Sequence, residues 1–104
     1  MQTLHSDEPR FNTDPALAER RRLFIRHTEV LAHRLLLAFL EDDPAERALQ
    51  VLAVANDSGI RAERWELSCQ TAMAAANFWR QTDAELGRRL ILARLLELTE
   101  IDAA

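Results

Sequence analysis

The chain of 104 residues contains no lysine and no tyrosine, one cysteine, two glycines and three prolines. A single cysteine excludes an internal disulfide and a cysteine-based zinc cluster. Two glycines are too few for the glycine-rich loops that bind phosphate groups. The longest apolar run, from Leu35 to Leu40, is too short to span a bilayer. The first residues do not show the basic-then-apolar pattern of a secretory signal, so we expect a cytoplasmic protein.

Because lysine is missing, all 13 basic residues are arginine. Two explanations are open. Codon usage in a GC-rich bacterial genome favours arginine and alanine, and selection against lysine would protect the chain from lysine-directed modification. The formal net charge is −4. An acidic balance argues against nonspecific binding of the whole surface to nucleic acid or to anionic membranes.

The chain is rich in alanine, leucine, arginine and glutamate, which are all good helix formers. Helix-start signals follow at three places, and Gly59 is a natural helix stop. Together they predict helices over about 15–41, 44–56, 61–80 and 83–101, and a flexible arm over residues 1–13. The start signals are Asp14 before Pro15, the capping-box pair Asp43 and Glu46 around Pro44, and the capping-box pair Thr82 and Glu85.

Short connections make sequential helices antiparallel or sharply crossed neighbours. The pattern therefore predicts an all-α fold, a compact four-helix bundle built from two helix hairpins, as one domain over residues 14–104. Helical spacing predicts one apolar face on each of the first two helices. The first face comprises Leu17, Phe24, Thr28, Leu31, Leu35 and Ala38, and the second comprises Ala45, Ala48, Leu49, Leu52 and Ala55.

The third helix has two apolar faces, with Trp65, Cys69 and Trp79 on one and Leu67 and Phe78 on the other. Surplus apolar surface of this kind is typical of an oligomer or partner interface. The alternative is that the third helix is central and that the long first helix covers it.

Aromatic residues and arginine dominate the binding energy of most protein interfaces. We therefore predict an apolar contact through three residues of the third helix and a charged contact through four residues of the first, in a homo-oligomer that binds another protein. The apolar set is Trp65, Ala72 and Trp79, and the charged set is Arg22, Arg26, His33 and Arg34.

The segment around Gly59 resembles a helix-turn-helix, since Ala55, Gly59, Ile60 and Trp65 occupy the expected positions. The pattern breaks at Ser58 and Ser68, where apolar residues are usual. The resemblance implies a DNA-binding regulator that reads bases with Arg61 and Arg64. The alternative is an ordinary glycine-terminated helix joined to another, which the acidic Glu63 and Glu66 favour because they repel phosphate.

No catalytic or metal-binding pattern stands out. Cys69 lies among apolar neighbours and has no adjacent histidine to activate it. Glu29 and His33 are four residues apart, a spacing at which both side chains could bind one metal ion from the same helix face, but no second pair completes a site. We therefore expect no enzyme, cofactor or metal. The predicted function is a small protein-protein interaction module of the adaptor, chaperone, antitoxin or inhibitor type.

Overall fold

The structure, a computed structural model, describes the backbone of residues 14–103 and the side chains of residues 14–100. This part of the chain forms four helices and no strand, which confirms the predicted all-α class. The predicted arm over residues 1–13 lies outside the described residues. The helices are α2 (Pro15–Phe39), α3 (Pro44–Ser58), α4 (Ala62–Thr82) and α5 (Ala84–Ala103).

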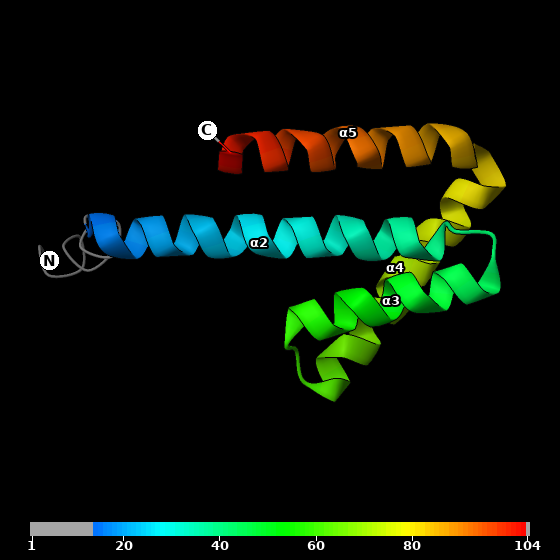
Figure 1. Ribbon diagram of the computed structural model, residues 1–104, viewed down its shortest axis with the longest axis horizontal. Helices are drawn as coiled ribbons and strands as arrows, with labels where there is room; N and C mark the ends of the chain where they lie inside the picture. The colour runs from blue at the N-terminus through cyan, green and yellow to red at the C-terminus, as the bar shows by residue number, and fades with distance from the viewer. Residues whose placement is uncertain (1–13, 104) are drawn as a thin grey trace, which may run out of the picture.

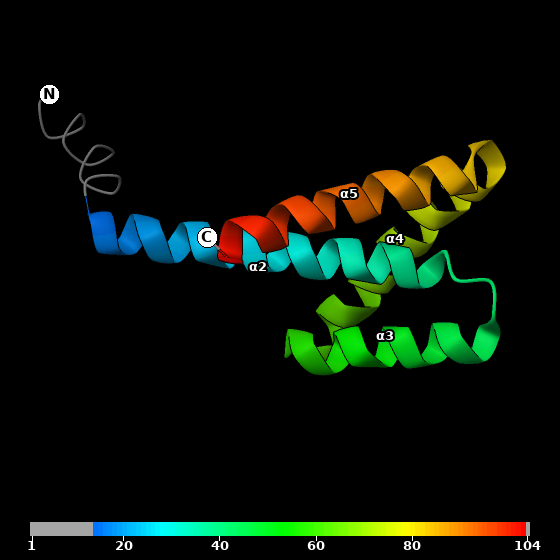
Figure 2. The same ribbon diagram turned by 45° about the horizontal axis from the view of Figure 1, so that its top comes forward.

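The long helix α2 is the centre of the bundle and contacts each of the other three helices. α3 and α5 run antiparallel to α2 on different sides of it, as Figure 1 shows. α4 crosses α2 obliquely and joins the side of α3 to the side of α5, which is clearest when Figures 1 and 2 are compared. α4 also contacts α5 directly. The two helix hairpins predicted from the sequence, α2 with α3 and α4 with α5, therefore pack around α2.

Two of the predicted helix-end signals act as expected. The carboxylate of Asp14 caps α2 by accepting hydrogen bonds from the backbone amides of Ala16 and Leu17, at 3.0 and 3.3 Å. Gly59 ends α3 with φ +63°. A residue without a Cβ adopts that left-handed conformation without strain.

Neither predicted capping box forms. Asp43 precedes α3 but makes no side-chain capping bond, and Glu46 accepts a hydrogen bond from Gln50 instead. Thr82 is the last residue of α4, and its hydroxyl donates back to the carbonyl of Phe78. The cap of α5 is one residue later, at Asp83, whose side chain accepts from the amide of Leu86 at 3.0 Å.

Two small apolar clusters of the core lie along the C-terminal half of α2. The first joins Leu31 and Leu35 of α2 to one residue each of α3 and α4, namely Val54 and Ala72. The second joins Leu40, at the end of α2, to one residue each of α4 and α5, namely Ala76 and Ile91. The apolar run that begins at Leu35 therefore contacts all three neighbouring helices.

Arginines from three helices converge on the C-terminal end of α2. The last carbonyls of a helix have no partner within it and carry partial negative charge, so cationic donors stabilise them. These bonds fix the corner at which the chain leaves α2. Arg80 of α4 donates to the carbonyl of Phe39, Arg88 of α5 to that of Leu40 at 2.7 Å, and Arg47 of α3 to that of Glu41 at 2.9 Å.

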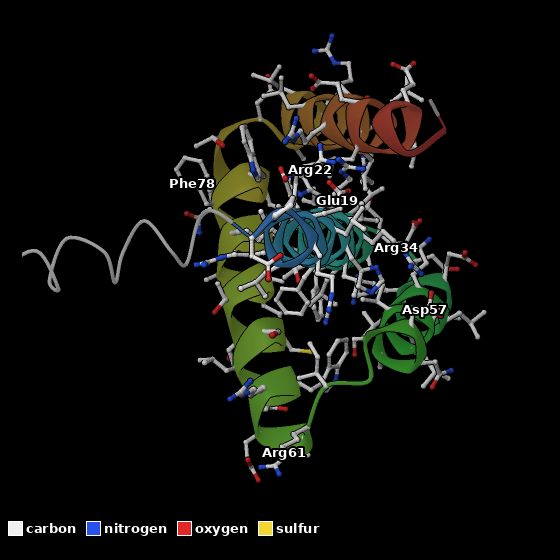
Figure 3. The ribbon with its side chains drawn as sticks, turned by 90° about the vertical axis from the view of Figure 1, so that its left-hand side faces the viewer. Glu19, Arg22, Arg34, Asp57, Arg61 and Phe78 are labelled. Carbon is white, nitrogen blue, oxygen red and sulfur yellow. The ribbon has the colours of Figure 1, made fainter. Side chains whose placement is uncertain are left out.

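Two ion pairs hold neighbouring helices against α2. Arg94 of α5 binds the carboxylate of Glu29 through two hydrogen bonds of 2.7 and 3.1 Å. Arg34 of α2 binds Asp57 of α3 at 2.8 Å, and the two side chains point toward each other in Figure 3. Among the described residues, none of the helices is long and apolar enough to cross a membrane.

Candidate interaction surface

The apolar face of α2 continues beyond the part of the helix that α3 and α4 cover. Leu17, Phe24 and Leu31 recur at seven-residue spacing and therefore lie on one face. Leu31 is only 9% exposed, whereas Phe24 is 69% exposed. The reason is visible in Figure 1, where α3 and α4 pack against the C-terminal half of α2 and leave its N-terminal half without them. We call residues 15–28 the α2 extension.

A second apolar face lies on the outside of α3. The sequence predicts an apolar face of this helix that includes Leu49 and Leu52, and the structure leaves both of these side chains exposed. Leu49 is 63% exposed and Leu52 58% exposed, whereas Val54 is 3% exposed and Val51 packs beside it on the core. Val54 and Val51 hold the helix in this orientation through the first core cluster, and Asp57 pairs with Arg34 of α2 on the same side. We call Leu49 and Leu52 the α3 outer face.

The other two helices also expose apolar side chains. On α5, Ile91 and Leu98 are buried, while Leu92 and Leu96 are exposed. On α4, the face that carries Leu67 and Phe78 is exposed, and Figure 3 shows Phe78 pointing away from α2. Scattered exposed leucines are normal, and the α2 extension differs from them because it continues a buried face.

The three predicted apolar contact residues lie in the core of the single chain. Ala72 is buried in the first cluster, and Trp65 packs against it. Trp79 packs against the second cluster. A Cβ built on Gly87 would lie 2.5 Å from Cδ2 of Trp79, so the indole occupies the space beside that glycine. This face of α4 is therefore covered by the chain itself, which leaves the opposite face exposed.

The four predicted charged residues do not form one patch. Arg22 pairs with Glu19 at 2.5 Å, on the side of α2 toward α5, whereas Arg34 points toward α3. His33 lies with Nδ1 2.8 Å from the carbonyl oxygen of Glu29 and is half-buried. Arg26 is also half-buried and has a partner within the chain.

The residues of the helix-turn-helix prediction lie at the start of α4. Arg61 is its N-cap residue and Arg64 lies in its first turn, and both are exposed. Glu63 and Glu66 lie at the same end of α4 and are also exposed. Ile60, which packs inside a helix-turn-helix, is 41% exposed here.

The pKa shifts of Cys69 and Glu29 have structural causes. Burial raises the pKa of the Cys69 thiol, and the charge of Glu66 raises it further, so the thiolate is disfavoured. The hydrogen bond from Arg94 holds the pKa of Glu29 below its ordinary value. Over residues 14–100, the structure brings together no group of three or more histidine, cysteine, aspartate or glutamate side chains that would hold a metal ion.

Comparisons with protein-family models, with curated proteins and with solved structures gave no match for this chain.

Proposed function

We propose that this chain is a small non-enzymatic protein-protein interaction module that self-associates and works in the cytoplasm. Adaptors, chaperones, antitoxins and inhibitors of larger machines all fit this description. The observation that supports it best is the α2 extension, where Leu17 and Phe24 continue the line of the buried Leu31 into solvent. Polar Arg21 and Thr28 alternate with them on that side of the helix. Phe24 is the most exposed large apolar side chain on it.

The physical argument rests on the cost of leaving that face in water. Burial of a leucine or phenylalanine side chain contributes roughly 1.5 to 3 kcal/mol. The extension and the α3 outer face together expose several such side chains, Leu17, Phe24, Leu49 and Leu52 among them. A second protein surface that covers them would gain this energy, whereas α3 and α4 of the same chain are packed against the C-terminal half of α2.

Light scattering over a range of concentrations tests self-association. We expect the mass to rise from monomer to dimer or a higher state. Phe24→Asp should weaken that association about tenfold or more, since a truncated interface aromatic commonly costs 1 to 2 kcal/mol or more. The control is Leu67→Asp, a change at an equally exposed position on α4, where the side chain is 68% exposed. A monomer at every concentration would overturn self-association.

A second candidate is a DNA-binding regulator that uses α3 and α4. It is favoured by the left-handed Gly59 and by the short connection of residues 59–61 between the two helices. The acidic Glu63 and Glu66 count against it. Gel retardation at low salt, lost in Arg61→Ala and in Arg64→Ala, would support it, and no retardation would eliminate it.

A further inference from the structure

The α2 extension and the helix α3 match each other in length. The extension covers residues 15–28, and α3 has 15 residues. At a rise of 1.5 Å per residue, each is about 22 Å long. Both present a line of exposed apolar side chains, Leu17 and Phe24 on one and Leu49 and Leu52 on the other. Two helical segments of equal length that each expose apolar side chains are suited to packing along one another.

The two segments carry opposite charge. Residues 15–28 contain four arginines and one glutamate, which gives a net charge of +3 with neutral histidine. α3 contains two acidic residues and one arginine, a net charge of −1, and the connection of residues 41–43 before it adds three acidic residues, so that residues 41–58 together carry −4. Opposite charges favour contact between an extension and α3. Contact between two extensions, or between two copies of α3, would place like charges together.

The charges also flank the apolar faces. Arg20 and Arg21 follow Leu17 by three and four residues, which places them beside it on the helix surface. Glu46 precedes Leu49 by three residues in the first turn of α3, and it is exposed. The arginines lie beside the apolar side chains of the α2 extension, and a carboxylate lies beside those of the α3 outer face. The two faces are therefore complementary in charge as well as in apolar character.

The extension cannot reach the α3 outer face of its own chain. α2 is one continuous helix, and α3 packs against its C-terminal half through Val54 and the Arg34–Asp57 pair. The α3 outer face points away from that contact. The occupant of each face must therefore come from another molecule.

We propose that the occupant is a second copy of this chain. Each copy places the Leu17 and Phe24 face of its α2 extension on the α3 outer face of the other. Because each chain carries both surfaces, two equal contacts related by a two-fold axis close a dimer. This inference rests on the self-association proposed above and names the surfaces that mediate it.

Cysteine cross-linking tests the pairing in the full chain. In a Cys69→Ala background, single cysteines are introduced by Phe24→Cys, by Leu49→Cys and, as a control on an equally exposed α4 position, by Leu67→Cys. Each variant is treated with a short bis-maleimide, alone and mixed in pairs. Denaturing gels report covalent dimers, and light scattering of the same samples before treatment reports the native mass.

We expect the mixture of Phe24→Cys and Leu49→Cys to give a covalent dimer, with at least a fivefold higher yield than either variant alone or any mixture with Leu67→Cys. A dominant dimer from Phe24→Cys alone, or from Leu49→Cys alone, would overturn the pairing. So would a native dimer that none of these pairs cross-links, although self-association would then stand. A native monomer would overturn self-association itself.

Discussion

Gly87 of α5 lies against the indole of Trp79 of α4. A Cβ at position 87 would approach Cδ2, Cγ and Cε3 of the ring to 2.5, 2.7 and 2.9 Å. These atoms include the root of the indole, which cannot swing away without moving the side chain from the second core cluster. The two residues therefore set how closely α4 and α5 approach each other across the turn at Asp83.

Gly87→Ala is expected to destabilise the protein by about 1 to 2 kcal/mol, since overpacking a tight contact typically costs 1 to 3 kcal/mol. Helix propensity alone predicts the opposite sign, a gain of about 1 kcal/mol. Thermal or urea unfolding measures the difference. A double variant, Gly87→Ala with Trp79→Phe, should lose less unfolding free energy than the sum of the losses in the two single variants, because the smaller phenylalanine ring leaves space for the alanine Cβ. A rise in stability with Gly87→Ala would contradict the contact.

The Arg94–Glu29 pair predicts an acid-dependent contribution to stability. The pKa of Glu29 is lowered from its ordinary value of 4.5, chiefly by the hydrogen bond from Arg94. A carboxylate with a lowered pKa in the folded state stabilises the fold above the ordinary value, and this contribution is lost as the pH falls through the lowered value. We therefore expect Glu29→Gln to unfold more easily than wild type at neutral pH and to match it well below pH 4.5.

The control for that pair is Glu97→Gln. Glu97 also approaches Arg94, but at 3.9 Å and with its side chain 64% exposed. Exposed pairs contribute little. Unfolding midpoints of wild type and both variants across the acidic range are the measurement. The difference in unfolding midpoint between wild type and Glu29→Gln should shrink on acidification. A difference that does not shrink would contradict the stabilising role of the Arg94–Glu29 pair.

Removal of the donor at the end of α2 should also be measurable. Arg88 donates to the carbonyl of Leu40 at 2.7 Å, beside the second core cluster. Arg88→Met keeps much of the side-chain volume but leaves that carbonyl without this donor, which should cost about 1 to 3 kcal/mol. Arg89→Met, at the exposed neighbouring position on α5, should change unfolding by less than about 0.5 kcal/mol. Equal effects of the two substitutions would remove the special role of Arg88.

Salt provides a prediction for the dimer. The +3 extension and the −4 segment around α3 attract each other. Raising the ionic strength from about 0.05 M to about 0.5 M shortens the Debye length severalfold and screens that attraction. We expect the dissociation constant from light scattering or sedimentation to rise severalfold. Association that strengthens with salt would indicate a contact between like-charged surfaces, such as two extensions.

The sequence predicted the helices and the apolar face of α2 because both depend on local spacing. Asp14 and Gly59 act at the helix ends where their chemistry predicted. In both capping boxes a residue of the predicted pair bonds to a partner four residues away instead, Glu46 to Gln50 and Thr82 to Phe78. Asp83 rather than Thr82 caps α5, since the hydroxyl of Thr82 donates to the preceding turn.

The candidate surface was harder to predict from the sequence because it depends on how the helices are placed. A helix with two leucines on one side and two valines on another predicts that the leucines are buried. The structure buries Val54 and exposes Leu49, because Val54 packs against residues of α2 and α4 that are distant in the sequence. Similarly, Ala72 and Trp79 are core residues because α2 and α5 cover them. The contact of Gly87 with Trp79 also requires knowledge of the turn between α4 and α5.

Amide hydrogen exchange of the full chain at low and high protein concentration tests the central claim most directly. If each extension packs on the α3 of a second copy, amides of residues 15–28 and of α3 should become more protected as concentration rises, while the exposed end of α4 around Leu67 stays unchanged. Exchange that is independent of concentration, or new protection confined to α5, would contradict the account.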